Sequence, residues 1–513
     1  MSFAKVHSAQ TSFLKAHIID IEVDLSKGLH SFAIVGLPDK AVEEARDRIS
    51  AAIKNSGFKS PKNKNQKVVI SLAPADIKKE GPFFDLGMAL AYLLAAEEID
   101  FDPEKIIFLG ELSLDGKLRK INGVLPLVKH AKEKGFKKVF VPKENAEEAA
   151  LIDGIEVYGV ETLEEVLNHV DTTREEALQI PVQPKTKIPP SKKGEGIDFE
   201  DIRGQESAKR GLEIAAAGGH NVALYGPPGT GKTMLAKAFS RILPPLSFDE
   251  ILEATGIHSV AGTLSGSLII DPPFRAPHHT SSYVSIVGGG ATPKPGEATL
   301  AHKGVLFLDE FPEFERRVID ALRQPLEERM VSVSRAKGSA QFPANFILIA
   351  AMNPCPCGNY GFKGKECTCA PANILRYQRK ISGPIIERID IWLEVPRIEH
   401  IKLSEEEYRG EKSESIRKRV VEARKLQEKR LKKSGKKTNA EMSAKDLVGL
   451  IHLDDETKAL LNNSAEHMNL SPRVYHKIIK VARTIADLEG AASVNGNHIL
   501  EAIQYRPRKQ DSF

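Results

Sequence analysis

A glycine-rich segment between a strand pattern and a helix pattern constrains this chain more than any other feature. Its eight residues are Gly226, Pro227, Pro228, Gly229, Thr230, Gly231, Lys232 and Thr233. Residues 221–225 before it are apolar enough for a short buried strand, and apolar residues recur at helical spacing over 235–242. In this context the segment is a phosphate-binding loop, whose backbone N–H groups and helix N-terminus surround the phosphates. We expect Lys232 to contact the β- and γ-phosphates of a nucleoside triphosphate and Thr233 to ligate Mg²⁺.

Two further strand patterns end in polar residues that suit the same site. The apolar run 304–308 ends in Asp309 and Glu310, and the run 346–351 leads to Asn353. The carboxyl ends of parallel strands meet at one edge of a sheet, where such side chains come together. Asp309 can hold Mg²⁺ through its water shell, and Glu310 can polarise the attacking water as a general base. Asn353 can donate to the γ-phosphate or position that water.

Together these motifs resemble the AAA+ ATPases, and the resemblance extends to two arginines. It implies that ATP is the nucleotide and that Asn353 is the first sensor. Arg388 matches the arginine finger, which reaches the nucleotide of a neighbouring subunit. Arg473 matches the second sensor, because Ser471 and Pro472 suit the N-cap and the first residue of a helix. Either arginine can instead be an ordinary surface ion-pair residue, and the sequence leaves both alternatives open.

The spacing of the motifs resembles that of a particular branch of the AAA+ proteins. The interval from Lys232 to Asp309 is 77 residues, which leaves room for an insertion. A hairpin pattern over 330–342 precedes the strand of Asn353, and a Cys-Pro-Cys-Gly run ends at Gly358. These positions resemble the magnesium-chelatase-like AAA+ proteins, and over nearly the whole chain they resemble the ComM/YifB family. The resemblance implies a homo-hexameric ring and DNA branch migration during natural transformation.

Four segments differ in composition. Residues 171–198 are rich in proline and lysine and are typical of an extended linker. Residues 1–170 alternate strand and helix patterns, and 199–396 carry the nucleotide motifs. The resemblance implies that 397–513 are a basic connector and a helical lid. The predicted fold class is therefore α/β, with a parallel-sheet P-loop core and helical lid preceded by a second α/β domain.

The N-terminal domain resembles the Lon protease domain through residues 108–116 and 141–145. Peptidases of that kind need a serine nucleophile and a lysine base. The matching positions here hold Phe83 and Leu125, which can neither attack a carbonyl group nor transfer a proton. We therefore predict that the domain has no peptidase activity and serves assembly, substrate docking or capping of the ring.

All four cysteines of the chain fall within 15 residues, at Cys355, Cys357, Cys367 and Cys369. Such clustering excludes a disulfide framework and can close a tetrahedral zinc site of structural type. The CxC spacing differs from the usual CxxC, so reduced thiols without a metal remain the alternative.

Basic residues suggest two places for DNA. From Glu414 to Lys437 there are 11 Lys or Arg against 3 Glu, which suits either a solvated helix or contact with phosphates. Arg335 and Lys337, at the tip of the predicted hairpin, are better candidates for DNA contacts in a central pore. Aromatic residues are few there, which favours tracking of the backbone over stacking on bases.

Apolar residues make up 41% and charged residues 28% of the 513 residues, as in soluble globular proteins. The apolar run 86–96 is too short to span a membrane, and the N-terminus lacks a signal-peptide core, so a cytoplasmic protein is expected. The favoured function is a Mg²⁺-dependent ATPase ring acting on DNA. The alternatives are an ATPase subunit that drives metal insertion into a porphyrin, and a remodeller of proteins.

Overall fold

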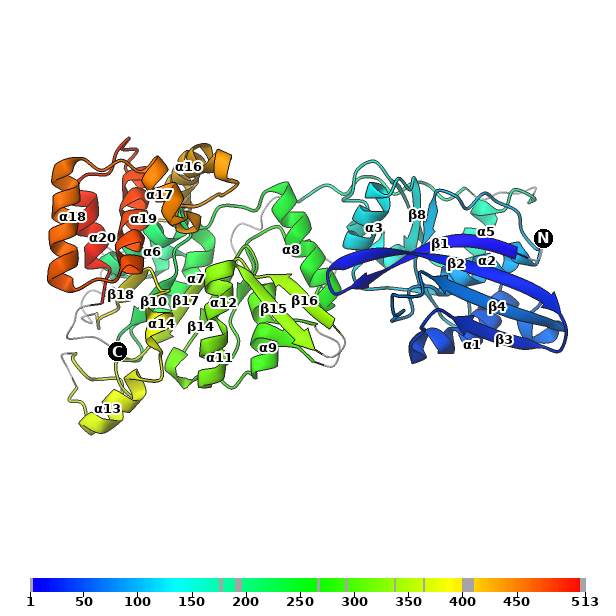
Figure 1. The fold of residues 1–513 in the computed structure, drawn as a ribbon, viewed down its shortest axis with the longest axis horizontal. Coiled ribbons are helices and arrows are strands. Elements are labelled where there is room, and N and C mark those ends of the chain that lie inside the picture. Colours follow the sequence, from blue (N-terminus) through cyan, green and yellow to red (C-terminus); the bar gives the residue numbers. More distant parts are fainter. Residues whose placement is uncertain are drawn as a thin grey trace. The chain divides into compact units, whose positions relative to one another are not determined.

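The computed structural model describes residues 3–174, 179–189, 196–264, 268–290, 294–335, 338–362, 365–398 and 410–507. The chain forms two compact units (Figure 1). The first unit comprises Met1–Pro189 and Phe248–Ile269, and the second comprises Pro190–Ser247 and Ile270–Phe513. Within the described ranges, no helix combines the length and the apolar character that a membrane span requires.

The first unit is built on a seven-stranded mixed sheet with the order β3-β4-β2-β1-β5-β8-β9. Its strands are β1 (Phe3–Ser12), β2 (Lys15–Lys27), β3 (Ser31–Val35), β4 (Gln66–Ala73), β5 (Ile106–Phe108), β8 (Lys138–Pro142) and β9 (Glu156–Val160). A small hairpin joins β6 (Glu111–Leu112) to β7 (Leu118–Arg119). Its helices are α1 (Lys40–Asn55), α2 (Asp85–Ala95), α3 (Val124–Glu133), α4 (Ala146–Ala149) and α5 (Leu163–Val170). The α/β character predicted for the N-terminal residues is confirmed.

A helix from the middle of the chain completes the first unit. This helix, α8 (Phe248–Ala261), follows the phosphate-loop helix in sequence, yet it packs against α3. Ile251, Ala254 and Ile257 of α8 are buried, and a Cβ atom placed on Gly256 would lie 3.8 Å from Cδ of Pro126. The sequence range predicted for the ATPase core therefore contains a segment that folds with the N-terminal residues.

Buried hydrogen bonds join α8 to the turn before α3. The backbone N–H of Gly123 donates to Oγ of Ser259 at 2.9 Å, and the Ser259 hydroxyl donates to the Glu148 carboxylate. The same carboxylate accepts the N–H of Leu125 at 3.0 Å. Burial raises the pKa of Glu148, and these donors oppose that rise. Leu125, which is expected from the sequence at the position of the Lon lysine, is buried in the core that α3 shares with Phe83.

The second unit contains a five-stranded sheet with the order β11-β14-β17-β10-β18, and all its pairs are parallel. Its strands are β10 (Val222–Tyr225), β11 (Phe274–Arg275), β14 (Val305–Leu308), β17 (Ile347–Met352) and β18 (Ile391–Glu394). The helices around it are α6 (Glu206–Gly218), α7 (Lys232–Ile242), α9 (Tyr283–Val287), α10 (Glu297–Leu300), α11 (Arg316–Ala321), α12 (Arg323–Glu328), α13 (Pro371–Gln378) and α14 (Gly383–Ile386). The predicted parallel-sheet core is confirmed.

Two hairpins accompany this sheet. One pairs β12 (Gly288–Gly289) with β13 (Lys294–Pro295), and the other pairs β15 (Met330–Arg335) with β16 (Gly338–Pro343). The second hairpin agrees with the pattern at 330–342. The backbone of Arg335 ends β15, and Lys337 lies outside the described residues.

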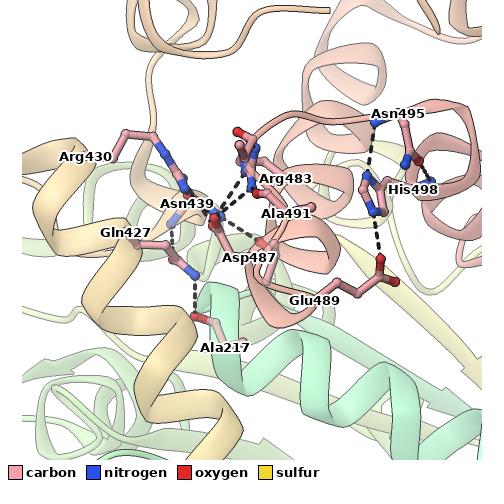
Figure 2. Close-up of polar contacts among 12 residues, drawn as sticks. Ala217, Gln427, Arg430, Asn439, Arg483, Asp487, Glu489, Ala491, Asn495 and His498 are labelled. Carbon is pink, nitrogen blue, oxygen red and sulfur yellow. Dashed lines mark hydrogen bonds and ion pairs between the residues drawn. The ribbon is translucent and has the colours of Figure 1, made fainter.

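The C-terminal helices are α16 (Ser413–Leu431), α17 (Ala444–Leu450), α18 (Asp455–Met468), α19 (Pro472–Leu488) and α20 (Gly496–Gln504). Figure 2 shows the buried polar contacts that hold them together. The Asp487 carboxylate accepts hydrogen bonds from Arg430, Arg483 and Asn439, and the Gln427 amide donates to the carbonyl of Ala217 in α6 at 3.1 Å. Because α16 and α19 share one apolar core with the parallel sheet, the helical lid belongs to the second unit.

The basic stretch forms a helix, as predicted, and part of its charge is used within the chain. Arg419 of α16 forms ion pairs with Glu213 and Glu411, and Arg430 pairs with Asp487. The lysines Lys418, Lys425, Lys429, Lys432 and Lys433 are exposed. These exposed lysines, in α16 and directly after it, are therefore candidates for phosphate contact.

Candidate nucleotide-hydrolysing site

The predicted phosphate loop connects β10 to α7. Gly229 and Gly231 have φ angles of 75° and 92°, a left-handed conformation that glycine adopts without strain. A Cβ atom added to either glycine would have no atom within 4 Å, so the loop borders open space there. Lys232 is the first residue of α7, and Leu235, Phe239 and Ile242 anchor that helix in the core. The loop N–H groups and the N-terminus of α7 can therefore bind phosphate.

Lys232 occupies the centre of this loop. Its Nζ donates to the carbonyl oxygens of Gly226 at 2.7 Å and Pro227 at 2.8 Å, and to Oδ1 of Asn353 at 3.1 Å. The side chain is buried, and burial lowers the pKa of the amine to about 8, although the Asp309 charge opposes this. An ammonium group held only by neutral oxygens can form stronger, charge-assisted bonds to a phosphate. The structure thus brings together Lys232 and Asn353.

ATP binding is expected to be accompanied by proton uptake at alkaline pH. The pKa of Lys232 is about 8 in the free protein, so near pH 8.5 much of this amine is neutral. A bound triphosphate favours the ammonium form and raises the pKa. Uptake should be small at pH 7 and should approach about one proton near pH 9. Titration calorimetry in buffers of different ionisation enthalpy measures the number of protons taken up when ATP binds. A Lys232→Arg variant, which stays protonated, is the control, and equal uptake in both proteins would contradict the assignment.

Thr233 and Asp309 form a donor pair that fits Mg²⁺. The Thr233 hydroxyl donates to Oδ2 of Asp309 at 2.8 Å, so the two oxygens already lie side by side. Neighbouring oxygens around an octahedral Mg²⁺ are about 2.9 Å apart, since each lies 2.0–2.1 Å from the ion. A hydroxyl and a carboxylate oxygen at this spacing suit a Mg²⁺ ion whose remaining ligands are water and phosphate oxygens.

Glu310 follows Asp309 in an unusual backbone conformation. Its φ angle is 53°, in the left-handed region that few residues other than glycine adopt. The carboxylate is half-exposed, and its Oε2 lies 2.9 Å from Nδ1 of His279. The sequence does not indicate His279 as a site residue, because a histidine in an insertion has no distinguishing pattern. Its contact with Glu310 appears only after β11 has joined the sheet beside β14.

The two predicted arginines contact the same glutamate, Glu327, rather than the phosphate loop of their own chain. Arg388 forms an ion pair with Glu327, and its Nη1 donates to the carbonyl of Pro384 at 2.7 Å. Arg473, in the first turn of α19 after its N-cap Ser471, lies 2.6 Å from the same Glu327 carboxylate. Both arginines therefore belong to one cluster around Glu327.

This cluster lines a cavity at the opposite edge of the sheet from the phosphate loop. The cavity has a volume of about 690 Å³ and is lined by Asn221, Phe346 and Asp390, which precede β10, β17 and β18. The phosphate loop, Asp309 and Asn353 follow the carboxyl ends of their strands instead. The four residues of β10, at about 3.3 Å each, separate the two edges by roughly 13 Å. Lys477 and Lys480 also line this cavity and make it rich in positive charge.

The four predicted metal ligands come together. The Sγ atoms of Cys355, Cys357, Cys367 and Cys369 all lie within 4.8 Å of one another. Cys355 is buried and the other three are partly exposed. The cluster follows Asn353 directly in the chain.

Comparisons with known proteins cover almost the whole chain. The family described as magnesium chelatase, subunit ChlI matches residues 198–403, and its C-terminal family matches 410–506. A third family, subunit ChlI of Mg-chelatase, matches 21–145.

Full-length relatives include competence protein ComM of Haemophilus influenzae. It is 41% identical over 508 residues, which are 99% of this chain and 98% of that protein. YifB of Escherichia coli is 41% identical over 508 residues, which are 99% of this chain and 97% of that protein. Lon protease 2 of Bacillus subtilis is 40% identical over 99 residues, which are 19% of this chain and 18% of that protein.

Proposed function

The chain belongs to the ComM/YifB family of magnesium-chelatase-like AAA+ ATPases, and from this premise we propose that it forms a hexameric ring that couples ATP hydrolysis to movement along DNA. The proposed substrates are branched or joint molecules, and the proposed reaction is branch migration. The observation that carries the proposal is the end-to-end similarity to a competence protein. The contacts of Lys232 with Asn353 and of Thr233 with Asp309 support it.

In this proposal each residue of the site has one task. The phosphate loop and Lys232 bind the triphosphate, and Thr233 and Asp309 would hold Mg²⁺, which neutralises phosphate charge. Glu310 accepts a proton from the attacking water, and Asn353 orients that water or the γ-phosphate. ATP and Mg²⁺ are the proposed cofactors, with a structural Zn²⁺ at the four cysteines.

The ring is supported by the position of the two arginines. Arg388 and Arg473 lie at the amino edge of the sheet, where they cannot reach the phosphate loop of their own chain. In a closed ring, the amino edge of one subunit can face the carboxyl edge of the next. Both arginines would then act on the nucleotide of the neighbour, and Glu327 would hold them in place in the absence of that contact.

DNA contact is proposed for two surfaces. The β15–β16 hairpin is the proposed pore element, and Arg335 and Lys337 are its proposed DNA contacts. The exposed lysines of α16 are the second surface, and their contacts would depend on salt because phosphate binding releases counterions. Neither surface requires base recognition, as suits a motor that moves along any sequence.

A second candidate function is favoured by the matches to magnesium chelatase subunit ChlI. On that view the chain is the ATPase subunit of a complex that inserts a metal into a porphyrin. The full-length relatives, which include a competence protein, favour the DNA motor over this candidate and over a remodeller of proteins.

The test is the ATPase rate of the purified chain with and without four-way DNA junctions, at low and high salt. We expect junctions to stimulate hydrolysis at low salt and the stimulation to weaken at high salt. Lys232→Ala should abolish the activity under all conditions, because the variant cannot hold the triphosphate. A wild-type rate indifferent to every form of DNA would contradict the DNA motor and favour the chelatase or remodeller.

A further inference from the structure

The four cysteine sulfur atoms have the spacing of a metal-thiolate tetrahedron. Sγ of Cys355 lies 3.4 Å from that of Cys357 and 3.7 Å from that of Cys367, and the latter two are 3.6 Å apart. Zinc binds thiolates at about 2.3 Å, so the edges of a ZnS₄ tetrahedron are about 3.8 Å long. A disulfide would bring two sulfurs to about 2.05 Å. The observed spacing fits one metal ion among four thiolates.

Hydrogen-bond donors lie next to the cysteine sulfur atoms, as is usual for thiolates that bind a metal ion. The backbone N–H of Tyr360 donates to Sγ of Cys355 at 3.4 Å, and the Asn359 amide lies 3.9 Å from Sγ of Cys357. Such outer hydrogen bonds stabilise the negative charge of the ligands and orient them. Four soft sulfur ligands in tetrahedral spacing select Zn²⁺ among the common divalent ions.

The cluster lies between the phosphate loop and the strand end that carries Asn353. Gly358, with a φ angle of 80°, packs so closely that an added Cβ would lie 2.5 Å from Cδ of Pro228. The chain then enters α13, in which Tyr377 is buried. The cysteine ligands therefore hold together a loop that begins directly after Asn353 and packs against the phosphate loop.

We propose that Zn²⁺ bound by Cys355, Cys357, Cys367 and Cys369 acts as a clamp. It would hold Asn353 and the phosphate loop in the relative position that nucleotide binding requires. The ion would be structural, because four protein ligands leave no open position for water or substrate. The metal site stands on the sulfur geometry alone, whereas its effect on nucleotide rests on the proposed ATPase function.

Metal content tests the site itself. Full-length protein purified without added metal should carry about one zinc per chain, and the Cys355→Ser/Cys367→Ser variant should carry none. Lys365→Ala, an exposed change in the same loop, is the control and should keep its zinc. Replacement of zinc by Co²⁺ should give the absorption spectrum of a tetrahedral tetrathiolate. Metal-free wild-type protein with four freely reactive thiols would overturn the proposal.

Nucleotide affinity tests the clamp. Chelator-stripped wild-type protein should bind a fluorescent ATP analogue about 10–100-fold more weakly, the loss expected when a hydrogen bond to a charged group is displaced. Added Zn²⁺ should restore the affinity, which excludes irreversible denaturation as the cause, and an unchanged circular dichroism spectrum of the stripped protein should show that the fold persists. Unchanged affinity after zinc removal would overturn the clamp. Stoichiometric zinc in a protein that never hydrolyses ATP would instead overturn the proposed ATPase function and leave the metal site standing.

Discussion

Replacing Arg388 by alanine is expected to slow ATP hydrolysis by about 10³–10⁵-fold, the contribution of an arginine finger to phosphoryl transfer. Binding of ATP should change little, because the phosphate loop and Lys232, which hold the triphosphate, remain intact in the variant. Steady-state phosphate release and equilibrium binding of a labelled nucleotide measure the two properties separately. Arg316→Ala removes an exposed arginine of the same unit and should leave both unchanged.

Mixing two inactive variants shows whether Arg388 acts on a neighbour. Lys232→Ala lacks a working phosphate loop, and Arg388→Ala lacks the finger. In mixed rings an intact loop and an intact finger meet at about a quarter of the interfaces, so activity should reappear on mixing. If both groups served the same chain, no mixture would regain activity. Full hydrolysis by Arg388→Ala alone, or by protein that stays monomeric with nucleotide, would contradict the shared site.

Glu310→Gln is expected to bind ATP and hydrolyse it about 10²–10⁴-fold more slowly, because the amide cannot accept the proton of the attacking water. The side chains have the same shape, so the contact with His279 and the fold should persist. Single-turnover hydrolysis with preformed protein–ATP complex measures the chemical step. Glu313→Gln, a nearby carboxylate that pairs with Lys380, is the matched control. Normal turnover by Glu310→Gln would remove this residue as the base.

Local patterns predicted the strand, loop and helix at the carboxyl edge of the parallel sheet. The strand predicted over 221–225 is β10 (Val222–Tyr225), and the helix begins at Lys232 as the loop motif requires. Such features depend on neighbours in sequence: a buried strand, glycines at left-handed positions and apolar residues at helical spacing. The N-cap at Ser471 was predictable for the same reason, since its side chain bonds to a residue three positions later.

Long-range contacts were not predictable in the same way. Glu327, which pairs with both Arg388 and Arg473, lies 146 positions from Arg473 in sequence, and nothing local marks it. The sequence also does not indicate that α8 packs with the first unit. Its apolar residues occur on almost every side, so the pattern predicts burial without indicating the partner. Only the folded chain shows that α3 is that partner.

The discontinuity of the first unit limits how this protein can be dissected. A fragment ending at Pro189 would lack α8, and it would expose the apolar surface around Pro126 and leave the buried Glu148 without Ser259. The complementary fragment would carry the 14 residues of α8 with no partner to cover them. Neither fragment therefore retains a complete unit, and an isolated N-terminal module would need residues 248–269 grafted onto it.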